Sequence, residues 1–202
     1  MYKRQVVFDG HKFRSHIFSS RGGSSSKPQY FRFDIEFEDS EPTLDDTTRM
    51  QELKAAARLA LDGSKELDRL ARCLIAELFV FELDLLPNRY NGLNDITGYV
   101  FCRLENNSAA LSNLLDQLTV SSAKFLLQGQ LLAKPAKNST CLDENGNFRL
   151  RVCVSGLNEA SQISIQLQES STQPCNISGS PFSIASLISA QGLNSCLEPP
   201  IM

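Results

Sequence analysis

DENGNFRLRVCVSGLNEASQISIQLQESSTQPCNISGSPFSI, residues 143–184, is the stretch of this chain in which the residue pattern is clearest. It opens at Asn145-Gly146, a dipeptide that tolerates the positive φ angles of a tight turn. Two runs follow in which apolar and polar residues alternate, and a third begins after Gly179-Ser180-Pro181. The apolar members are Phe148, Leu150, Val152, Val154, Ile163, Ile165, Leu167, Phe182 and Ile184.

A period of two is typical of strands with one buried face, because successive side chains of a strand point to opposite sides. The three runs therefore predict antiparallel strands that form one corner of a β-sandwich. The apolar positions that we expect to be buried are Phe148, Leu150, Val152, Ile163 and Ile165. The polar positions that we expect to be exposed are Arg149, Arg151, Gln162 and Gln166.

The order of these residues resembles the closing strands of a filamin-type immunoglobulin-like repeat, which read D-G-x-Y-x-V, G-x-Y-x-I-x-V and I-x-G-S-P-F. The matching residues are Asn145-Gly146, Phe148, Ile163, Ile165 and Gly179-Ser180-Pro181-Phe182. Two departures are Gly156, which lies earlier than the family's glycine, and Glu169–Cys175, which lengthens the last hairpin loop. Earlier strands of the same repeat are matched at Phe79, Asp84, Gly98 and Phe101, so the resemblance covers about 79–185.

The chain before this region divides into three parts. Residues 1–5, MYKRQ, read as translated sequencing adapter and are expected to lie outside the fold. Residues 6–43 are predicted as a β-strand segment that resembles the end of a preceding repeat. Within it, Tyr30–Glu38 is the best single strand of the chain, with four apolar residues alternating with four charged ones. Residues 44–78 are predicted as a helical hairpin that breaks at Gly63.

Two stripes of leucine at helical spacing are expected to face a core. One belongs to the second predicted helix, over residues 67–78, and the other to a short helix over residues 108–118. After the predicted sandwich at 79–185, residues 186–202 are expected to be a tail or the opening of a following repeat.

Composition excludes several classes of function. A net charge of −3 and a pI near 5.5 give no electrostatic case for nucleic acid, and no apolar run is long enough for membrane insertion. The six cysteines form no C-x-x-C pair, so no metal site is predicted, and we expect thiols in preference to disulfides. No catalytic motif is present, so catalytic residues and cofactors are both predicted to be none.

The predicted fold is therefore mainly β with helical insertions: an immunoglobulin-like β-sandwich of filamin type, preceded by a short strand segment and a helical hairpin. The resemblance implies a non-catalytic structural or protein-interaction module, one unit of a longer filamin-like repeat protein. It implies a protein or peptide partner, cytoskeletal in kind, and a cytoplasmic location. Two alternatives stay open: an extracellular adhesion module on the same sandwich, and an accessory domain of an unseen enzyme.

The resemblance also implies a binding site, because such repeats accept an extended peptide beside strand C, over the groove toward strand D. Strand C corresponds to residues 99–104 and strand D to residues 125–132. If Tyr99 and Phe101 face the core, the partner-binding residues are Val100, Cys102, Leu104 and Leu127. The insertion at 106–120 is expected to cover this edge as a lid.

Overall fold

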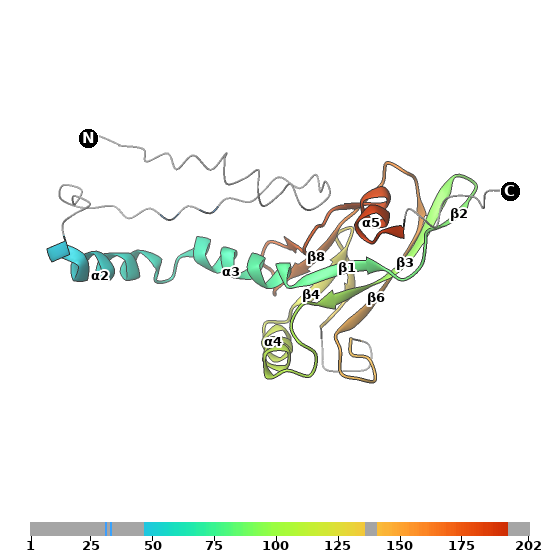
Figure 1. Ribbon diagram of the computed structural model, residues 1–202. Coiled ribbons are helices and arrows are strands. Elements are labelled where there is room, and N and C mark those ends of the chain that lie inside the picture. Colours follow the sequence, from blue (N-terminus) through green and yellow to red (C-terminus); the bar gives the residue numbers. More distant parts are fainter. Residues whose placement is uncertain (1–30, 32, 34–46, 136–140, 194–202) are drawn as a thin grey trace. The chain divides into compact units, whose positions relative to one another are not determined.

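The computed structural model describes residues 31, 33, 47–135 and 141–193, which form two compact units. One unit is 27–75, and the other consists of 1–26 with 76–202 (Figure 1). The predicted adapter segment lies outside the described residues. So does most of the predicted strand segment 6–43, in which only Phe31 and Phe33 are described and neither forms part of a strand.

Both helices of the predicted hairpin are present, but they do not pack side by side as the helices of a hairpin would (Figure 1). The bounds are Thr47–Arg49 for η1, Met50–Leu61 for α2 and Lys65–Glu77 for α3. Gly63 lies between α2 and α3 with a φ of 69°, so the predicted break is confirmed. The prediction that the leucine stripe of α3 faces a core is wrong, because Leu67 and Leu74 are 39% and 59% exposed. An apolar stripe shows which face of a helix favours burial, but it does not show whether another element packs against that face.

The second unit contains a four-stranded antiparallel sheet around one long strand. Its strands are β1 (Phe79–Leu83), β2 (Asn88–Tyr90), β3 (Leu93–Cys102) and β6 (Arg149–Leu157). β3 pairs with β1 and β2 on one side and with β6 on the other (Figure 1). Positive φ angles at Asn91 and Gly92 make the tight turn that joins β2 to β3.

A second antiparallel sheet has the order β5-β4-β8-β9, and a short pair joins β7 to β10. The bounds are β4 Lys124–Leu127, β5 Gln130–Ala133, β7 Gln162–Ile163, β8 Ile165–Gln168, β9 Cys175–Asn176 and β10 Phe182–Ser183. The single strand predicted over 125–132 is wrong, since Gln128 and Gly129 have positive φ and fold it into a hairpin. The antiparallel arrangement predicted for the closing strands is confirmed where Ile163 pairs with Phe182.

The two faces of the closing strands follow the sequence pattern. All five apolar residues that define the buried face are inside: Phe148, Leu150, Val152, Ile163 and Ile165. Arg149, Arg151 and Gln162 are exposed. Gln166 is half-buried, because its Nε2 donates a hydrogen bond of 3.0 Å to Oδ1 of Asn176 on the neighbouring strand.

Three aromatic rings join the two sheets at the centre of the core. The centroid of Phe79 lies 5.0 Å from that of Phe125 on β4 and 5.2 Å from that of Phe148, in edge-to-face arrangements. Phe125 and Phe148 lie 5.8 Å apart. All three side chains are fully or almost fully buried, and such ring pairs add stability beyond the burial of their area.

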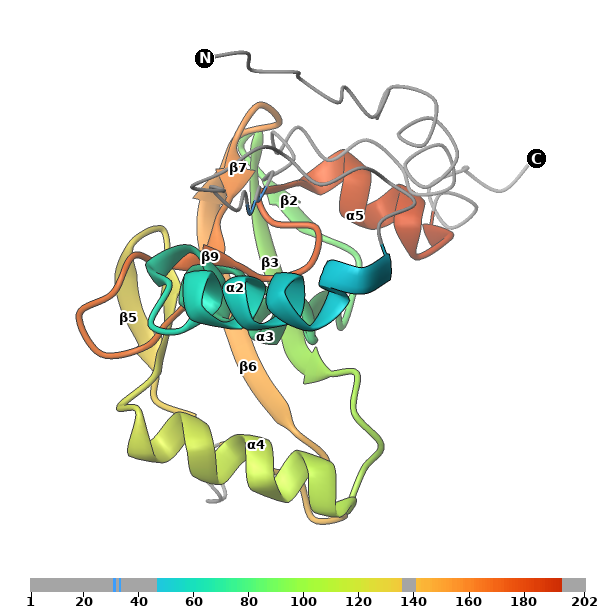
Figure 2. The same cartoon turned by 90° about the vertical axis from the view of Figure 1, so that its left-hand side faces the viewer.

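Two helices complete this unit. In α4 (Ala109–Val120), the hydroxyl of Ser108 accepts a hydrogen bond from the N–H of Leu111, and the predicted leucine stripe is buried. Figure 2 shows α4 across one end of the strands. Ile184, predicted to lie in a strand, instead begins α5 (Ile184–Ala190), because Ser183 and Ser186 form a reciprocal capping box.

Helices and strands take about equal shares of the described residues, so the prediction of a mainly β chain is wrong. Helices were predicted at the positions of α2, α3 and α4, but α5 was missed, and one strand was predicted where β4 and β5 form a hairpin. The antiparallel sheets are confirmed. No helix in the described part of the chain is long and apolar enough to cross a membrane.

The turn before β6 leads to a prediction on pH. The carboxylate of Asp143 accepts hydrogen bonds from the N–H groups of Asn147 and Asn145, both at 2.9 Å, and from Nδ2 of Asn147 at 2.8 Å. The bond from the Asn147 backbone is the largest cause that lowers the pKa of Asp143 below its ordinary value of 3.8, and the nearby charge of Arg149 adds to it. Because these bonds favour the ionised form, they stabilise the fold above the unfolded-state pKa.

That contribution is lost as the pH falls through the lowered folded-state pKa. We therefore expect Asp143→Ala to be less stable than the natural chain at pH 6, with the difference shrinking as the pH falls below about 4. Urea unfolding at a series of pH values measures this difference. Glu144→Ala, at the exposed neighbouring position, is the control and should show no such trend. A gap between Asp143→Ala and the natural chain that stays constant down to the acid limit would contradict the assignment.

Candidate functional site

The structure does not support the predicted groove beside strand C. Val100 is fully buried in β3 and pairs with Phe81 on one side and Leu150 on the other. The face assignment is inverted, since Tyr99 and Phe101 are half-exposed on the outer face of the sheet. The prediction that Val100 lines a groove is therefore wrong, because a strand with neighbours on both sides has no free edge there.

The other three predicted residues are each half-exposed. Cys102 is the last residue of β3, where it pairs with Phe79, and burial raises the pKa of its thiol. Leu104 lies in the loop that leads to α4, and Leu127 is the last residue of β4. The predicted lid over 106–120 is also wrong, because α4 buries its leucines in the core while β1 and β6 occupy both sides of β3.

The outer edge of β1, on the side away from β3, is covered at two points. The N–H of Ser178 donates a hydrogen bond of 2.9 Å to the carbonyl of Phe79. Further along, the amide side chain of Gln191 takes the place of a neighbouring strand. Its Oε1 accepts from the N–H of Leu83 at 2.8 Å, and its Nε2 donates to the carbonyl of Leu83 at 3.1 Å.

The outer edge of β6 differs, and the direction of its backbone groups follows from two hydrogen bonds. The N–H of Asp84 donates to the carbonyl of Thr97 at 2.9 Å, so odd-numbered residues of β3 point their backbone groups toward β1 and even-numbered ones toward β6. On β6, the N–H of Arg149 donates to the carbonyl of Cys141 at 2.9 Å, away from β3. The backbone groups of β6 that point outward are therefore those of Arg149 and of every second residue after it.

Arg151 and Cys153 follow Arg149 at every second position, so their N–H and C=O groups also point away from β3. Among the residues that the structure describes, no strand pairs with this side of β6, and nothing forms a hydrogen bond with those groups. The regular alternation ends before Gly156, at the irregularity opposite Asn94 and Ile96, where the N–H of Gly156 donates to Oδ1 of Asp95 on β3 at 2.9 Å. We call residues 150–155 of this strand, with their outward backbone groups, the β6 edge.

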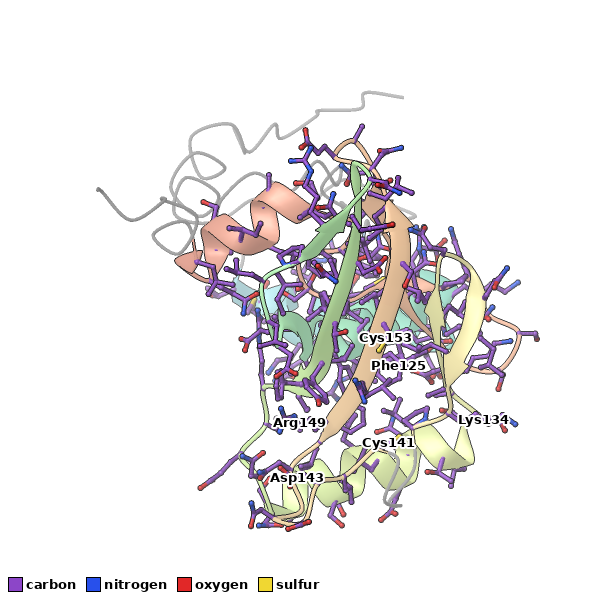
Figure 3. All side chains as sticks on the ribbon, turned by 90° about the vertical axis from the view of Figure 1, so that its right-hand side faces the viewer. Phe125, Lys134, Cys141, Asp143, Arg149 and Cys153 are labelled. Carbon is purple, nitrogen blue, oxygen red and sulfur yellow. The ribbon has the colours of Figure 1, made fainter. Side chains whose placement is uncertain are left out.

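Side chains give the β6 edge two distinct rows. On the inner face, Leu150 and Val152 are buried and Val154 is half-exposed. On the outer face, Arg151 and Cys153 are exposed, next to Arg149 just before the edge. Figure 3 looks onto this outer face, where Arg149 and Cys153 lie along the same strand.

The two arginines of the outer row differ in their surroundings. The guanidinium of Arg149 lies 3.8 Å from the centroid of the Tyr99 ring and 3.9 Å from the carboxylate of Asp84, which holds it against the sheet. Arg151 forms no ion pair with any described residue. In the outer row, the charge of Arg149 is therefore partly balanced by Asp84, whereas Arg151 has no carboxylate partner among the described residues.

The chemistry of the site is that of backbone pairing. In the described part of the chain, no group of three or more His, Cys, Asp and Glu side chains could hold a metal ion. No disulfide joins any two of the five cysteines in that part. No protein-family model matches the chain, and neither a curated protein nor a solved structure matches it.

Sequence reasoning identified β6 as a strand and assigned its faces correctly, but it missed the edge. Which strands are neighbours depends on long-range pairing, and the alternation of Arg149, Leu150, Arg151 and Val152 is the same for a central strand as for an edge strand. The available signal was the pair of arginines on the exposed face, since charged side chains are common on edge strands.

Proposed function

We propose that this chain is a non-catalytic protein-interaction module that binds an extended segment of a partner by β-strand addition at the β6 edge. The observation that carries the proposal is the contrast between the two outer edges of the sheet. On β1, the carbonyl of Phe79 and both backbone groups of Leu83 have partners, whereas the outward groups of Arg151 and Cys153 on β6 have none among the described residues. A row of unpaired backbone groups is a template for another strand.

The proposal includes a fold and a setting. We infer that the two sheets face each other as a sandwich, which the edge-to-face contact between Phe79 and Phe125 supports. The resemblance to a filamin-type repeat and the cytoskeletal partner stay predictions. A cytoplasmic location is proposed with them.

A protective role for the arginines is the competing explanation. Charged residues on an edge strand keep other strands away, and Arg149 and Arg151 are placed where they could do so. The two explanations differ in one respect. A protected edge rejects every added strand, whereas a binding edge accepts one whose side chains suit its two rows.

The proposal predicts a binding site that is confined to one edge. We expect a neutral peptide of alternating Val and Thr to shift the NMR signals of the Arg151 and Cys153 amides in the full chain, and to protect them from hydrogen exchange. The amide of Leu83 should not respond, because its N–H already donates a hydrogen bond to Oε1 of Gln191. Titration of the isotope-labelled chain followed by amide spectra measures both.

Cys153→Pro tests whether the backbone itself binds. Proline removes the outward N–H of residue 153, while Leu150 and Val152 keep their hydrogen bonds to β3. We expect about tenfold weaker peptide binding, because one hydrogen bond is lost and the ring blocks close approach. Cys153→Ala keeps the N–H and is the matched control. Equal affinity in the proline and alanine variants, or shifts at Leu83 in place of Arg151, would contradict the proposal.

A further inference from the structure

We propose that the occupant of the β6 edge is a strand of alternating apolar and acidic residues, supplied by residues 33–38 of a second copy of this chain. The inference rests on the proposed function, since it names the partner of the same edge. It is argued from the two side-chain rows of the edge and from the sequence of the chain.

The two rows of the edge define what an added strand must carry. Successive side chains of a strand point to opposite faces, so every second residue of the added strand lies beside the outer row and the others lie beside the inner row. The outer row contains Arg151 and Cys153, with Arg149 just before it, and the inner row contains Leu150, Val152 and Val154. Carboxylates suit the first row and apolar side chains suit the second.

The positive charge of the outer row favours an added strand with carboxylates over one with basic side chains. Cross-strand neighbours of opposite charge stabilise a sheet, and like charges placed opposite each other destabilise it. Arg151 has no ion-pair partner among the described residues, so an added acidic side chain would not compete with an existing contact. A strand with lysine or arginine at those positions would be repelled.

The chain contains one stretch with this alternation in ideal form. Residues 33–38 read Phe-Asp-Ile-Glu-Phe-Glu, with three apolar residues at every second position, three carboxylates between them, and no glycine or proline. The stretch is as long as the β6 edge at 150–155, and six residues is an ordinary strand length. Phe33 is 37% exposed, so its ring is available for burial against a partner.

The donor segment begins at Phe33 because Phe31 has another neighbour. The guanidinium of Arg69 lies 5.8 Å from the centroid of the Phe31 ring. Donation of a segment from one copy to the edge of another uses two different surfaces of the same chain. Such contacts close into a pair when they are reciprocal and otherwise continue as an open chain of copies.

The test is the oligomeric state of the full chain, measured by sedimentation over a range of concentrations. We expect the natural chain to self-associate. Reversing the charge of the edge with Arg151→Glu should raise the dissociation constant at least tenfold, and so should a triple variant of the segment, Asp34→Lys, Glu36→Lys and Glu38→Lys. Arg58→Glu, which makes the same charge change at an exposed position of α2, is the control and should associate normally.

Combining Arg151→Glu with the triple lysine variant in one chain should restore association, because both partners of the charge pair are then reversed. A natural chain that stays monomeric at every concentration would overturn the inference, and so would association that survives Arg151→Glu. A synthetic Phe-Lys-Ile-Lys-Phe-Lys peptide that binds the natural chain as tightly as Phe-Asp-Ile-Glu-Phe-Glu would overturn the acidic preference.

The same samples separate this inference from the proposed function. The triple lysine variant carries no acidic segment that competes for the edge, so the neutral Val/Thr peptide can be titrated against it. If the natural chain is monomeric but this peptide still shifts the amides of Arg151 and Cys153, the edge binds strands and the second copy is the wrong partner. If the peptide also fails, both the inference and the proposed function are wrong.

Discussion

Phe79→Ala should lower the free energy of unfolding by about 3–5 kcal/mol, the largest effect expected of any single substitution in this chain. Phe79 is fully buried, and its ring makes edge-to-face contacts with both Phe125 and Phe148. Truncation removes the apolar area of the ring, leaves a cavity at the junction of the two sheets, and breaks two of the three ring contacts there.

Denaturant unfolding of the two proteins measures this loss. Val120→Ala is the control, because Val120 is 86% exposed at the end of α4 and should change stability by no more than about 0.5 kcal/mol. A cost for Phe79→Ala that is no greater than for the control would show that the three rings do not form the centre of the core.

Gly98→Ala should cost about 1–3 kcal/mol or more, although it adds only one methyl group. A Cβ atom on Gly98 would collide with the carbonyl oxygen of Glu82 and come within 2.7 Å of the Phe81 ring. The ring can turn, but the carbonyl belongs to the backbone of β1. The clash is therefore relieved only if β1 moves away from β3.

Two further variants identify the backbone as the cause. Thr97→Val changes the neighbouring position without approaching β1 and should stay within about 0.5 kcal/mol of the natural chain. Gly98→Ala combined with Phe81→Leu should not regain the stability lost in the Gly98→Ala step, because the Glu82 carbonyl remains in place. Recovery of stability in that double variant would show that the ring was the obstacle.

The parts of the fold that the sequence predicted are those set by local periodicity. The alternation around Leu150 and Ile163 assigned both faces of the closing strands correctly, and the spacing of Leu111 and Leu118 located a helix that buries the same residues. In each case the side-chain pattern repeats with the period of the element, so no knowledge of distant neighbours is required.

The predictions that failed required knowledge of what lies beside an element. The predicted groove depended on Tyr99 and Phe101 facing the core, but the buried face of β3 carries Ile96 and Val100 instead. Leu67 and Leu74 have helical spacing and are still exposed. The β6 edge could not be found from the sequence, because pairing between strands determines which of them is last in a sheet.

The bond between Gln191 and Leu83 determines how many strands the sheet can accept. The two residues are 108 positions apart, and the amide side chain satisfies both backbone groups of Leu83. If a strand adds at the β6 edge, this side chain keeps Leu83 from offering a second site on the other side of the sheet. Replacing Gln191 with a residue that lacks an amide would remove that partner from both backbone groups of Leu83. A molecule that accepts a strand on both sides of its sheet is a branching unit, so Gln191 would keep an assembly of copies unbranched.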